Sequence, residues 1–228
     1  DPKSEVRDDK ICADYLKHPQ RYERLLASLY NQHVVPKLYI ALKLEKFEEI
    51  IDVLKQRKKS LFIYGPTGIG KTSLFLVMLQ DKILFTRHKD ALKHFDKNKH
   101  WAVLFDDMDF KKESKESLIN FTDQTQPSHI DVKRSMITLP QPINKIFTSN
   151  KDFDSFIKKL TSKEILEDQT ALSQVDAIKR RVHIIKLEKE DIQVRDKPFD
   201  PEDKVLITLK TLEYLIKRGV FPAKSLRS

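Results

Sequence analysis

The chain has 228 residues, a formal net charge of +9 and 39% hydrophobic residues, which is enough apolar material for a buried core. Its single cysteine, Cys12, excludes an internal disulfide, and no cysteine cluster offers a zinc site. No apolar run approaches the roughly 20 residues that cross a bilayer, so no membrane partner is expected. The positive charge fits a polyanionic partner and equally fits a solvated, lysine-rich surface, and charge alone does not decide between them.

The N-terminal part divides into two stretches. Residues 1–10 are almost all charged and predict a linker. In residues 11–56 apolar side chains recur at helical spacing, with Pro19 and Pro36 as breaks, so a small subdomain of two or three helices is expected. The sequence leaves open whether this subdomain is a lid packed on the core or an oligomerisation collar.

Residues 57–190 alternate short apolar runs with helical patterns, which predicts an α/β core with a central parallel sheet flanked by helices. Residues 128–138 instead alternate apolar and polar side chains, so a β-hairpin with a basic tip or edge is expected there. Strands are expected at residues 61–64, 82–86, 101–105, 144–150 and 182–185, and helices at residues 73–79, 90–95, 113–122 and 153–178.

The C-terminal segment, residues 191–228, is expected to be helical and to serve packing. Asp200 is the expected N-cap, and Pro201 suits the first helical position because its missing N–H would have no partner there. Gly219 is expected to end this helix.

The strongest signal for function is the stretch Gly65-Pro66-Thr67-Gly68-Ile69-Gly70-Lys71-Thr72, which fits the phosphate-binding pattern G-x-x-x-x-G-K-[ST]. An apolar run precedes it and a helical segment beginning at Ser73 follows it. In this context the loop N–H groups and the helix N-terminus surround phosphate oxygens. Lys71 is expected to reach the β- and γ-phosphates of ATP, and the Thr72 hydroxyl to ligate Mg²⁺. Residues 65–73 are therefore the predicted ATP-binding residues.

Two further predicted strands end in polar residues. Val103-Leu104-Phe105 runs directly into Asp106 and Asp107, which is the Walker B arrangement. Because ligands gather at the carboxyl ends of parallel strands, Asp106 is expected to hold the metal through water. Asp107 is expected to orient or deprotonate the attacking water, and Asn150 to bond either that water or the γ-phosphate.

In this order the elements resemble those of superfamily 3 helicases, an AAA+ branch found in replication initiators of small DNA viruses and plasmids. The chain is most similar to the helicase part of replication-associated (Rep) proteins of circular single-stranded DNA viruses. Residues 65–72 resemble motif A, residues 103–107 motif B, residues 130–134 motif B′ and residues 146–150 motif C. The pair Arg180-Arg181, which precedes a predicted strand, resembles the arginine finger.

The resemblance implies an AAA+-like P-loop core at residues 57–190 and an oligomerisation collar at residues 11–56. It also implies a ring of subunits, most often hexameric in this family, that hydrolyses ATP with Mg²⁺ and translocates along single-stranded DNA in rolling-circle-type replication. Such a protein works in the host nucleus if its source is a eukaryotic DNA virus, and otherwise in the cytoplasm.

The resemblance also implies roles for individual side chains. Asn150 would sense the nucleotide, and Lys133 with Arg134 would face single-stranded DNA in the pore. Arg180 or Arg181 would act in trans on a neighbour's ATP, because no residue near the glycine stretch or the paired acids in sequence supplies a further cation. Two other interpretations stay open: a solvated strand edge at Lys133 and Arg134, and local ion pairs for Arg180 and Arg181.

Several sequence features bear on other functions. No His-hydrophobic-His pair is present, so the origin-nicking activity of viral Rep proteins is not expected in this chain, which begins at Asp1 and is expected to be a fragment or a processed product. Helicases of the picornavirus type share motifs A, B and C and the paired arginines, which keeps RNA open as a substrate. A GTPase is disfavoured because no glycine follows Asp106 and Asp107 in a D-x-x-G pattern. A module that uses ATP only to assemble on nucleic acid remains open.

Overall fold

The computed structural model describes residues 39–108, 115–133, 135–158, 169–208 and 210–221, all of which belong to one compact unit, residues 36–228. The predicted linker, residues 1–10, lies outside the described residues. So does most of the predicted helical subdomain, up to residue 38.

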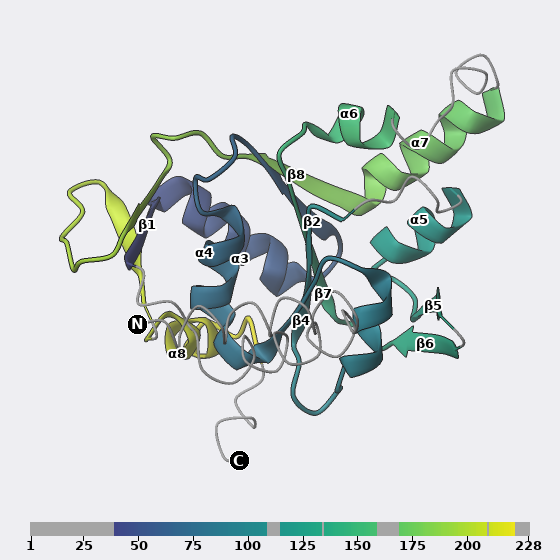
Figure 1. The fold of residues 1–228 in the computed structure, drawn as a ribbon, viewed down its shortest axis with the longest axis horizontal. Coiled ribbons are helices and arrows are strands. Elements are labelled where there is room, and N and C mark those ends of the chain that lie inside the picture. The colour runs from purple at the N-terminus through teal and green to yellow at the C-terminus, as the bar shows by residue number, and fades with distance from the viewer. Residues whose placement is uncertain (1–38, 109–114, 134, 159–168, 209, 222–228) are drawn as a thin grey trace, which may run out of the picture. The chain divides into compact units, whose positions relative to one another are not determined.

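A five-stranded parallel sheet forms the centre, with strand order β3-β4-β7-β2-β8 (Figure 1). All five predicted strands are confirmed to within one residue at each end. Most of their residues are buried on both faces, which explains why the sequence shows apolar runs there rather than alternation. The strands are β2 (Ser60–Tyr64), β3 (Ile83–Thr86), β4 (Ala102–Asp106), β7 (Asn144–Ser149) and β8 (Val182–Lys186).

Helices cover both faces of this sheet, as Figure 1 shows. The helices on one face are α3 (Leu44–Gln56), α4 (Lys71–Leu79) and α8 (Lys210–Lys217), and those on the other are α5 (Lys115–Thr122), α6 (Phe153–Lys158) and α7 (Gln169–Arg181). Successive residues of a strand point to opposite faces, so Leu61 and Ile63 pack in one apolar cluster while Phe62 packs in the other. The predicted α/β core with helices on both sides is therefore confirmed.

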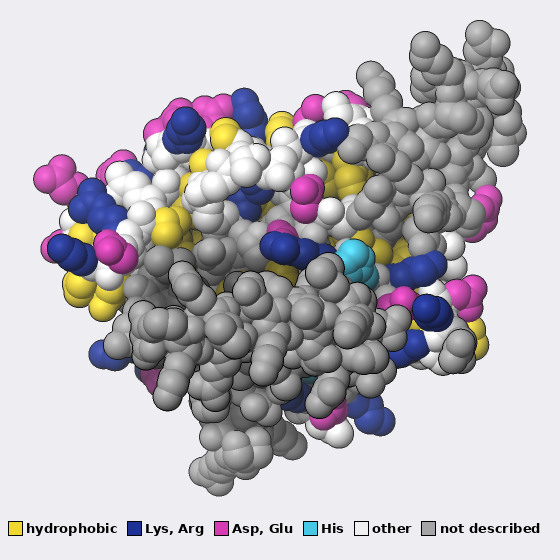
Figure 2. Space-filling model, in the orientation of Figure 1, with side chains coloured by type: hydrophobic (Ala, Val, Ile, Leu, Met, Phe, Trp, Pro, Cys, Tyr) yellow, Lys and Arg dark blue, Asp and Glu magenta, His cyan; other side chains and the backbone are white. Residues whose placement is uncertain are grey.

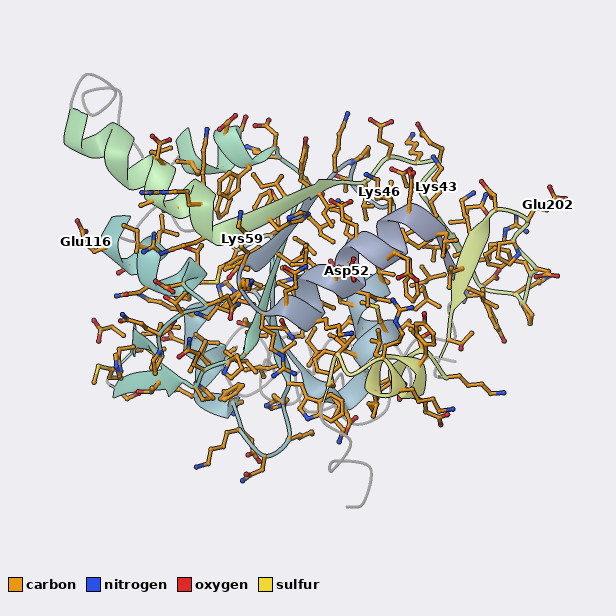
Figure 3. All side chains as sticks on the ribbon, turned by 180° about the vertical axis from the view of Figure 1, so that it is seen from behind. Lys43, Lys46, Asp52, Lys59, Glu116 and Glu202 are labelled. Carbon is orange, nitrogen blue, oxygen red and sulfur yellow. The ribbon has the colours of Figure 1, made fainter. Side chains whose placement is uncertain are left out.

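Helix α3 shows why the helical spacing was readable in this part of the sequence. It buries Phe47, Ile50, Ile51 and Leu54 on one side. Figure 3 views the molecule from behind, where α3 lies in front of the sheet with Asp52 on it and Lys46 near its first turn. The apolar stripe and the charged outer side together give the amphipathic period of a helix packed on a sheet.

Shorter elements join these layers. The predicted hairpin is confirmed as β5 (Ser128–Val132) paired antiparallel with β6 (Ser135–Leu139). Two 3₁₀ helices, η1 (Gln80–Lys82) and η2 (Lys89–His94), flank β3, and η2 stands where a short helix was predicted. Among the described helices, none has the length and apolar character needed to cross a membrane.

A second, three-stranded sheet corrects two helix predictions. It has the order β10-β1-β9 and consists of β1 (Tyr39–Lys43), β9 (Ile192–Arg195) and β10 (Lys204–Ile207). Residues 39–43 were expected within a helical stretch, and residues 204–207 within a helix that starts at Asp200. Both predictions are wrong, because β1 is stabilised by antiparallel pairing with segments more than a hundred residues away, which no local periodicity reports.

The C-terminal helix is shorter than predicted. α8 begins at Lys210 rather than at Asp200. Its predicted end is confirmed: Gly219 has φ +72°, and the N–H of Val220 bonds the carbonyl of Leu215 at 2.9 Å. Glycine suits this left-handed position because it carries no Cβ.

Candidate functional site

A cleft of about 1040 Å³ opens at the carboxyl edge of the parallel sheet. Its walls come from the glycine loop (residues 65–72) with the first turn of α4, from residues 87–90 after β3, from residues 106–108 at the end of β4, and from residues 148–150 at the end of β7. Parallel pairing sets Asp106 beside Thr148 and Tyr64 beside Ser149, so strand ends that are far apart in the sequence meet here. This is the edge at which open α/β sheets bind ligands.

Six of the predicted ATP-binding residues line the cleft: Thr67, Gly68, Gly70, Lys71, Thr72 and Ser73. The other three support the loop from behind. Gly65 and Pro66 supply carbonyl groups to Lys71, and Ile69 is buried in the apolar core.

Close packing explains two of the loop glycines. A Cβ on Gly70, which has φ +97°, would lie 2.4 Å from Cγ2 of Val194 on β9. A Cβ on Gly65 would lie 2.0 Å from the carbonyl oxygen of Leu187. Residues after β8 thus press against the loop, and only glycine leaves room for them. α4 begins directly after Gly70, without a side-chain cap on its first N–H groups.

Lys71 lies at the centre of the site. Its Nζ donates to the carbonyls of Gly65 at 2.9 Å and Pro66 at 2.8 Å, and to Oδ1 of Asn150 at 3.0 Å. The side chain is only 6% exposed, and burial lowers its pKa, while the carboxylates of Asp107 and Asp106 act in the opposite direction. The ammonium group is therefore held at the cleft wall by three uncharged acceptors. A negatively charged acceptor would form a stronger hydrogen bond and could replace them.

Asp106 is bound on both carboxylate oxygens. Oδ1 accepts hydrogen bonds from the hydroxyl of Thr72 and, at 2.8 Å, from that of Thr148. Oδ2 accepts from Nε of Arg87 at 3.0 Å. The predicted metal ligands, Thr72 and Asp106, are thus in direct contact, and both offer the oxygen atoms that Mg²⁺ prefers.

This ligand set is small. The described residues contain no cluster of three or more His, Cys, Asp or Glu side chains that could hold a metal ion. One carboxylate and one hydroxyl nevertheless suit Mg²⁺ in a phosphate site, where the ion keeps waters and takes its other ligands from the phosphates.

Asp107 and Asn150 form a second pair in the cleft. Asp107 has φ +45°, an uncommon value for a residue with a Cβ although aspartate tolerates it, and its N–H bonds the carbonyl of Thr148 at 2.9 Å. Its exposed carboxylate accepts from Nδ2 of Asn150 at 3.3 Å. Since Asn150 also accepts from Lys71, the predicted cation, amide and acid form one continuous chain.

Sequence reasoning missed Arg87. The sequence offered no further cation next to the glycine stretch or the paired acids, yet in the folded chain Arg87 lines the cleft and pairs with Asp106. Its position directly after β3 was a usable signal. The rule that singled out Asp106, a polar residue at the carboxyl end of a predicted parallel strand, applies to Arg87 as well.

The hairpin tip is connected to the cleft through η2. The N–H of Lys133 donates to Oδ1 of Asp90 at 2.7 Å, and the carbonyl of Lys133 accepts from Nζ of Lys93. Asp90 also lines the cleft. The side chain of Lys133 is exposed, and Arg134, the other predicted nucleic-acid contact, lies outside the described residues.

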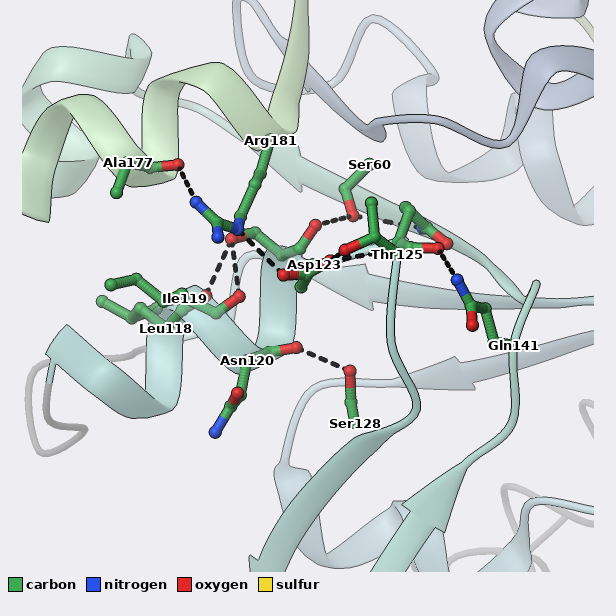
Figure 4. A network of polar contacts seen from close by, with 12 residues as sticks. Ser60, Leu118, Ile119, Asn120, Asp123, Thr125, Ser128, Gln141, Ala177 and Arg181 are labelled. Atoms are coloured by element: carbon green, nitrogen blue, oxygen red, sulfur yellow. Dashed lines mark hydrogen bonds and ion pairs between the residues drawn. The ribbon is translucent and has the colours of Figure 1, made fainter.

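The two predicted finger arginines are not in the cleft. They end α7 and precede β8, which places them at the amino edge of the sheet, a strand of five residues or roughly 16 Å away. There Arg181 donates from Nε to Asp123 at 3.0 Å and from Nη1 to the carbonyl of Ala177 at 2.8 Å (Figure 4). The alternative of a local ion pair therefore holds for Arg181, whereas Arg180 is exposed.

The visible surface does not gather its charge into one basic area. Figure 2 shows lysine and arginine side chains interspersed with acidic ones over the described residues of the face it presents, including the region of β5 and β6. On this face, contact with a polyanion would depend on individual side chains rather than on a broad field.

A scan against models of known protein families finds no match to this chain, and a search of curated proteins finds no significant match. The geometry of the cleft is therefore the basis on which a function can be proposed.

Proposed function

We propose that the cleft binds ATP with Mg²⁺ and hydrolyses it, and that residues 65–72 are the P-loop of an AAA+-like core. One observation carries this proposal. The Lys71 ammonium, the Thr72–Asp106 contact and the Asp107–Asn150 pair converge from three parallel strand ends on one cleft. Each is a group type that phosphoryl transfer needs, and the loop and the strand ends hold them in place before a ligand arrives.

The roles follow from the present contacts. Lys71 exchanges the carbonyls of Gly65 and Pro66 for phosphate oxygens, which accept stronger, charge-assisted hydrogen bonds. Thr72 and Asp106 would hold Mg²⁺, which supplies charge stabilisation to the phosphates when it is bound. The exposed carboxylate of Asp107 is free to accept a proton from water, and Asn150 keeps that carboxylate oriented.

Two substitutions test the site by their different signatures. Lys71→Ala should lower ATP turnover by about 10²- to 10³-fold, because a preorganised positive charge on the phosphates is lost. Asp107→Asn should still bind ATP but turn it over slowly, since the proton acceptor is gone. Lys97→Ala is the matched control, because it removes an exposed charge that does not line the cleft. Full turnover in either site variant would refute the assignment.

The second part of the proposal concerns the substrate. We infer that hydrolysis drives movement along single-stranded DNA, with RNA as the alternative substrate. The supporting observation is the hairpin: Lys133 is exposed at its tip, and the same residue is bonded to η2, which lines the cleft. A module that only binds nucleic acid in response to ATP is separated by measuring ATPase activity with and without single-stranded DNA and RNA. The ATPase activity of a translocating motor is stimulated by the nucleic acid along which it moves, whereas the activity of such a module is not.

The third part concerns assembly. Arg180 lies a full strand length from its own chain's cleft, farther than an arginine side chain extends, so a role in hydrolysis requires a neighbouring subunit. We therefore propose a ring, of six subunits by resemblance, in which Arg180 acts on the neighbour's ATP. An arginine supplied in trans contributes on the order of 10³-fold or more.

Mixing two inactive proteins tests the ring. Lys71→Ala lacks the loop lysine, and Arg180→Ala lacks the finger, so an interface that pairs an intact loop with an intact finger should recover activity. Arg181→Ala serves as the comparison, because its partner in this chain is Asp123 and its loss should change stability more than turnover. No recovery at any mixing ratio, with co-assembly demonstrated, would mean that Arg180 has no role in trans.

A further inference from the structure

The cleft contains a cation that the proposed mechanism does not use. Arg87 follows β3, and its Nε lies 3.0 Å from Oδ2 of Asp106. The Arg87 side chain is 67% exposed, while that of Asp106 is 10% exposed. An ion pair with one partner so open to water contributes little to stability, so folding alone gives weak grounds for an arginine here.

Most of the donors of Arg87 remain available. Only Nε bonds Asp106, and within the described residues the two terminal nitrogens make no hydrogen bond or ion pair. The guanidinium carbon lies 5.6 Å from the ring centroid of Phe85, an aromatic contact that holds the group at the end of β3. A planar guanidinium with free terminal N–H groups matches two phosphate oxygens at once.

Arg87 also bonds the carboxylate oxygen of Asp106 that a metal ion would use. Oδ1 of Asp106 already accepts from the hydroxyls of Thr72 and Thr148, so Oδ2 is the oxygen left for Mg²⁺ or for its bound water. A divalent ion at this carboxylate would repel the guanidinium, and the phosphate chain of a bound nucleotide would offer it negative charge in the same cleft.

We propose that Arg87 is a phosphate-binding residue of its own chain's nucleotide site, paired with Asp106 in this structure and transferred to the terminal phosphate when Mg²⁺ and ATP bind. The inference rests on the proposed function and adds a second cation in cis. The Mg²⁺ that Thr72 and Asp106 would hold bridges the β- and γ-phosphates in sites of this kind, so a contact beside Asp106 should favour ATP over ADP. Arg87 therefore reports whether the γ-phosphate is present.

Binding measurements isolate this contact from turnover. Asp107→Asn protein, in which hydrolysis is slow, is the background, and the Kd values of ATP and ADP are measured with Mg²⁺ and again with EDTA. Adding Arg87→Ala should weaken ATP binding roughly tenfold more than ADP binding, as expected for loss of a charge-assisted bond in a partly exposed site. Arg87→Lys should retain part of the preference, and Lys97→Ala should retain all of it.

The metal dependence tests the transfer itself. In EDTA the difference between the Arg87→Ala protein and its background should shrink, because Asp106 keeps the guanidinium. Equal loss of ATP and ADP affinity, no loss, or an undiminished penalty in EDTA would each overturn the inference. If the Asp107→Asn background binds no ATP at all, the proposed function itself fails. If the background binds ATP, and the Arg87→Ala and Lys97→Ala proteins have the same Kd values for ATP and ADP, only the role of Arg87 fails.

A chemical-modification experiment tests the same contact without a substitution at Arg87. In the Asp107→Asn background, Arg87 should react with an arginine-specific dicarbonyl more slowly in ATP and Mg²⁺ than in ADP and Mg²⁺, as followed by peptide mass spectrometry. Arg195, which is exposed and outside the cleft, is the internal control and should react equally in both. Equal rates at Arg87 in the two nucleotides would contradict the contact with the terminal phosphate.

Discussion

The two edges of the parallel sheet carry the same kinds of group and use them differently. At the carboxyl edge, Lys71 bonds two backbone carbonyls, and Arg87 pairs with Asp106. At the amino edge, Lys145 bonds the carbonyls of Asn120 at 3.4 Å and Asp123 at 2.5 Å, and Arg181 pairs with Asp123. A lysine on carbonyls beside an arginine–aspartate pair is therefore not by itself evidence of a ligand site.

Access to a cleft separates the two edges. Lys145 is 2% exposed, and its third partner is the hydroxyl of Ser128, so its ammonium is closed in by protein. Its two carbonyl partners, Asn120 and Asp123, lie at the end of α5, where a cation satisfies carbonyls that the helix leaves unpaired. Lys71 instead lines a cleft together with Asp106, Asp107 and Asn150, and its ammonium bonds the amide oxygen of Asn150. The amino-edge network holds α5 in place, and the carboxyl-edge network faces a space that a ligand can fill.

Replacing each of the two lysines by methionine should give the largest difference between the two edges. Lys71→Met should lower ATP turnover at least about 10²-fold, because a positive charge on the phosphates is lost. It should change the free energy of unfolding less than Lys145→Met does, since two of the three partners of Lys71, Pro66 and Asn150, are exposed residues. Lys145→Met should leave turnover per folded molecule unchanged and lower the free energy of unfolding by about 2 kcal/mol, because buried acceptors lose their donor. Urea unfolding and steady-state ATPase measurements on both proteins check this, and the reverse pattern would contradict it.

The second-largest expected effect is on the pH dependence of stability. Burial lowers the pKa of Lys145 to about 8, while Asp123 opposes the change. The unfolded chain, with the usual lysine pKa near 10.4, binds more protons above pH 8, so the free energy of unfolding should rise with pH. Relative to Lys145→Met, the protein should gain about 2 kcal/mol between pH 8 and pH 10. Parallel pH profiles for the two proteins would show that Lys145 is not the cause.

The two arginine–aspartate pairs should differ in a double-mutant cycle. Burial raises the pKa of Asp123, but hydrogen bonds from Thr125 and from Arg181 outweigh it and hold the pKa below its usual range. Arg181→Ala and Asp123→Ala should therefore show a coupling energy of about 1 kcal/mol in the free energy of unfolding. The matching cycle at Arg87 and Asp106 should give a value near zero, because Arg87 is mostly exposed. Equal coupling energies for the two pairs would show that the Arg87–Asp106 pair stabilises the fold as much as the Arg181–Asp123 pair does.

The smallest expected effect concerns the hairpin, which η2 joins to the carboxyl edge. Lys133→Ala should weaken single-strand binding alike for all sequences, because a phosphate contact carries no base information. The slope of log affinity against log salt should fall by roughly 0.7, the value for one contact to a single strand. Basal ATPase should largely persist, since this side chain does not line the cleft. Loss of ATPase with unchanged binding would assign the hairpin tip to the nucleotide site instead.

The sequence alone determined the features that depend on neighbouring residues. Apolar runs located the five parallel strands, because strands buried on both faces need continuous apolar residues. Alternation located β5 and β6, and the glycine pattern located the loop, because backbone freedom is a property of single residues. The positions of Lys71, Asp106, Asp107 and Asn150 in one cleft also followed, since the ends of parallel strands share an edge.

Only the tertiary structure decided the contacts between distant segments. The second sheet pairs β1 with β9 and β10, and local periodicity in residues 39–43 or 204–207 says nothing of such partners. Likewise the pairs Arg87–Asp106 and Arg181–Asp123 depend on which strand lies beside which and at which edge each side chain emerges. Charge is carried by the residue, but the function of a charge depends on its partner and on its access to solvent, and both are properties of the folded chain.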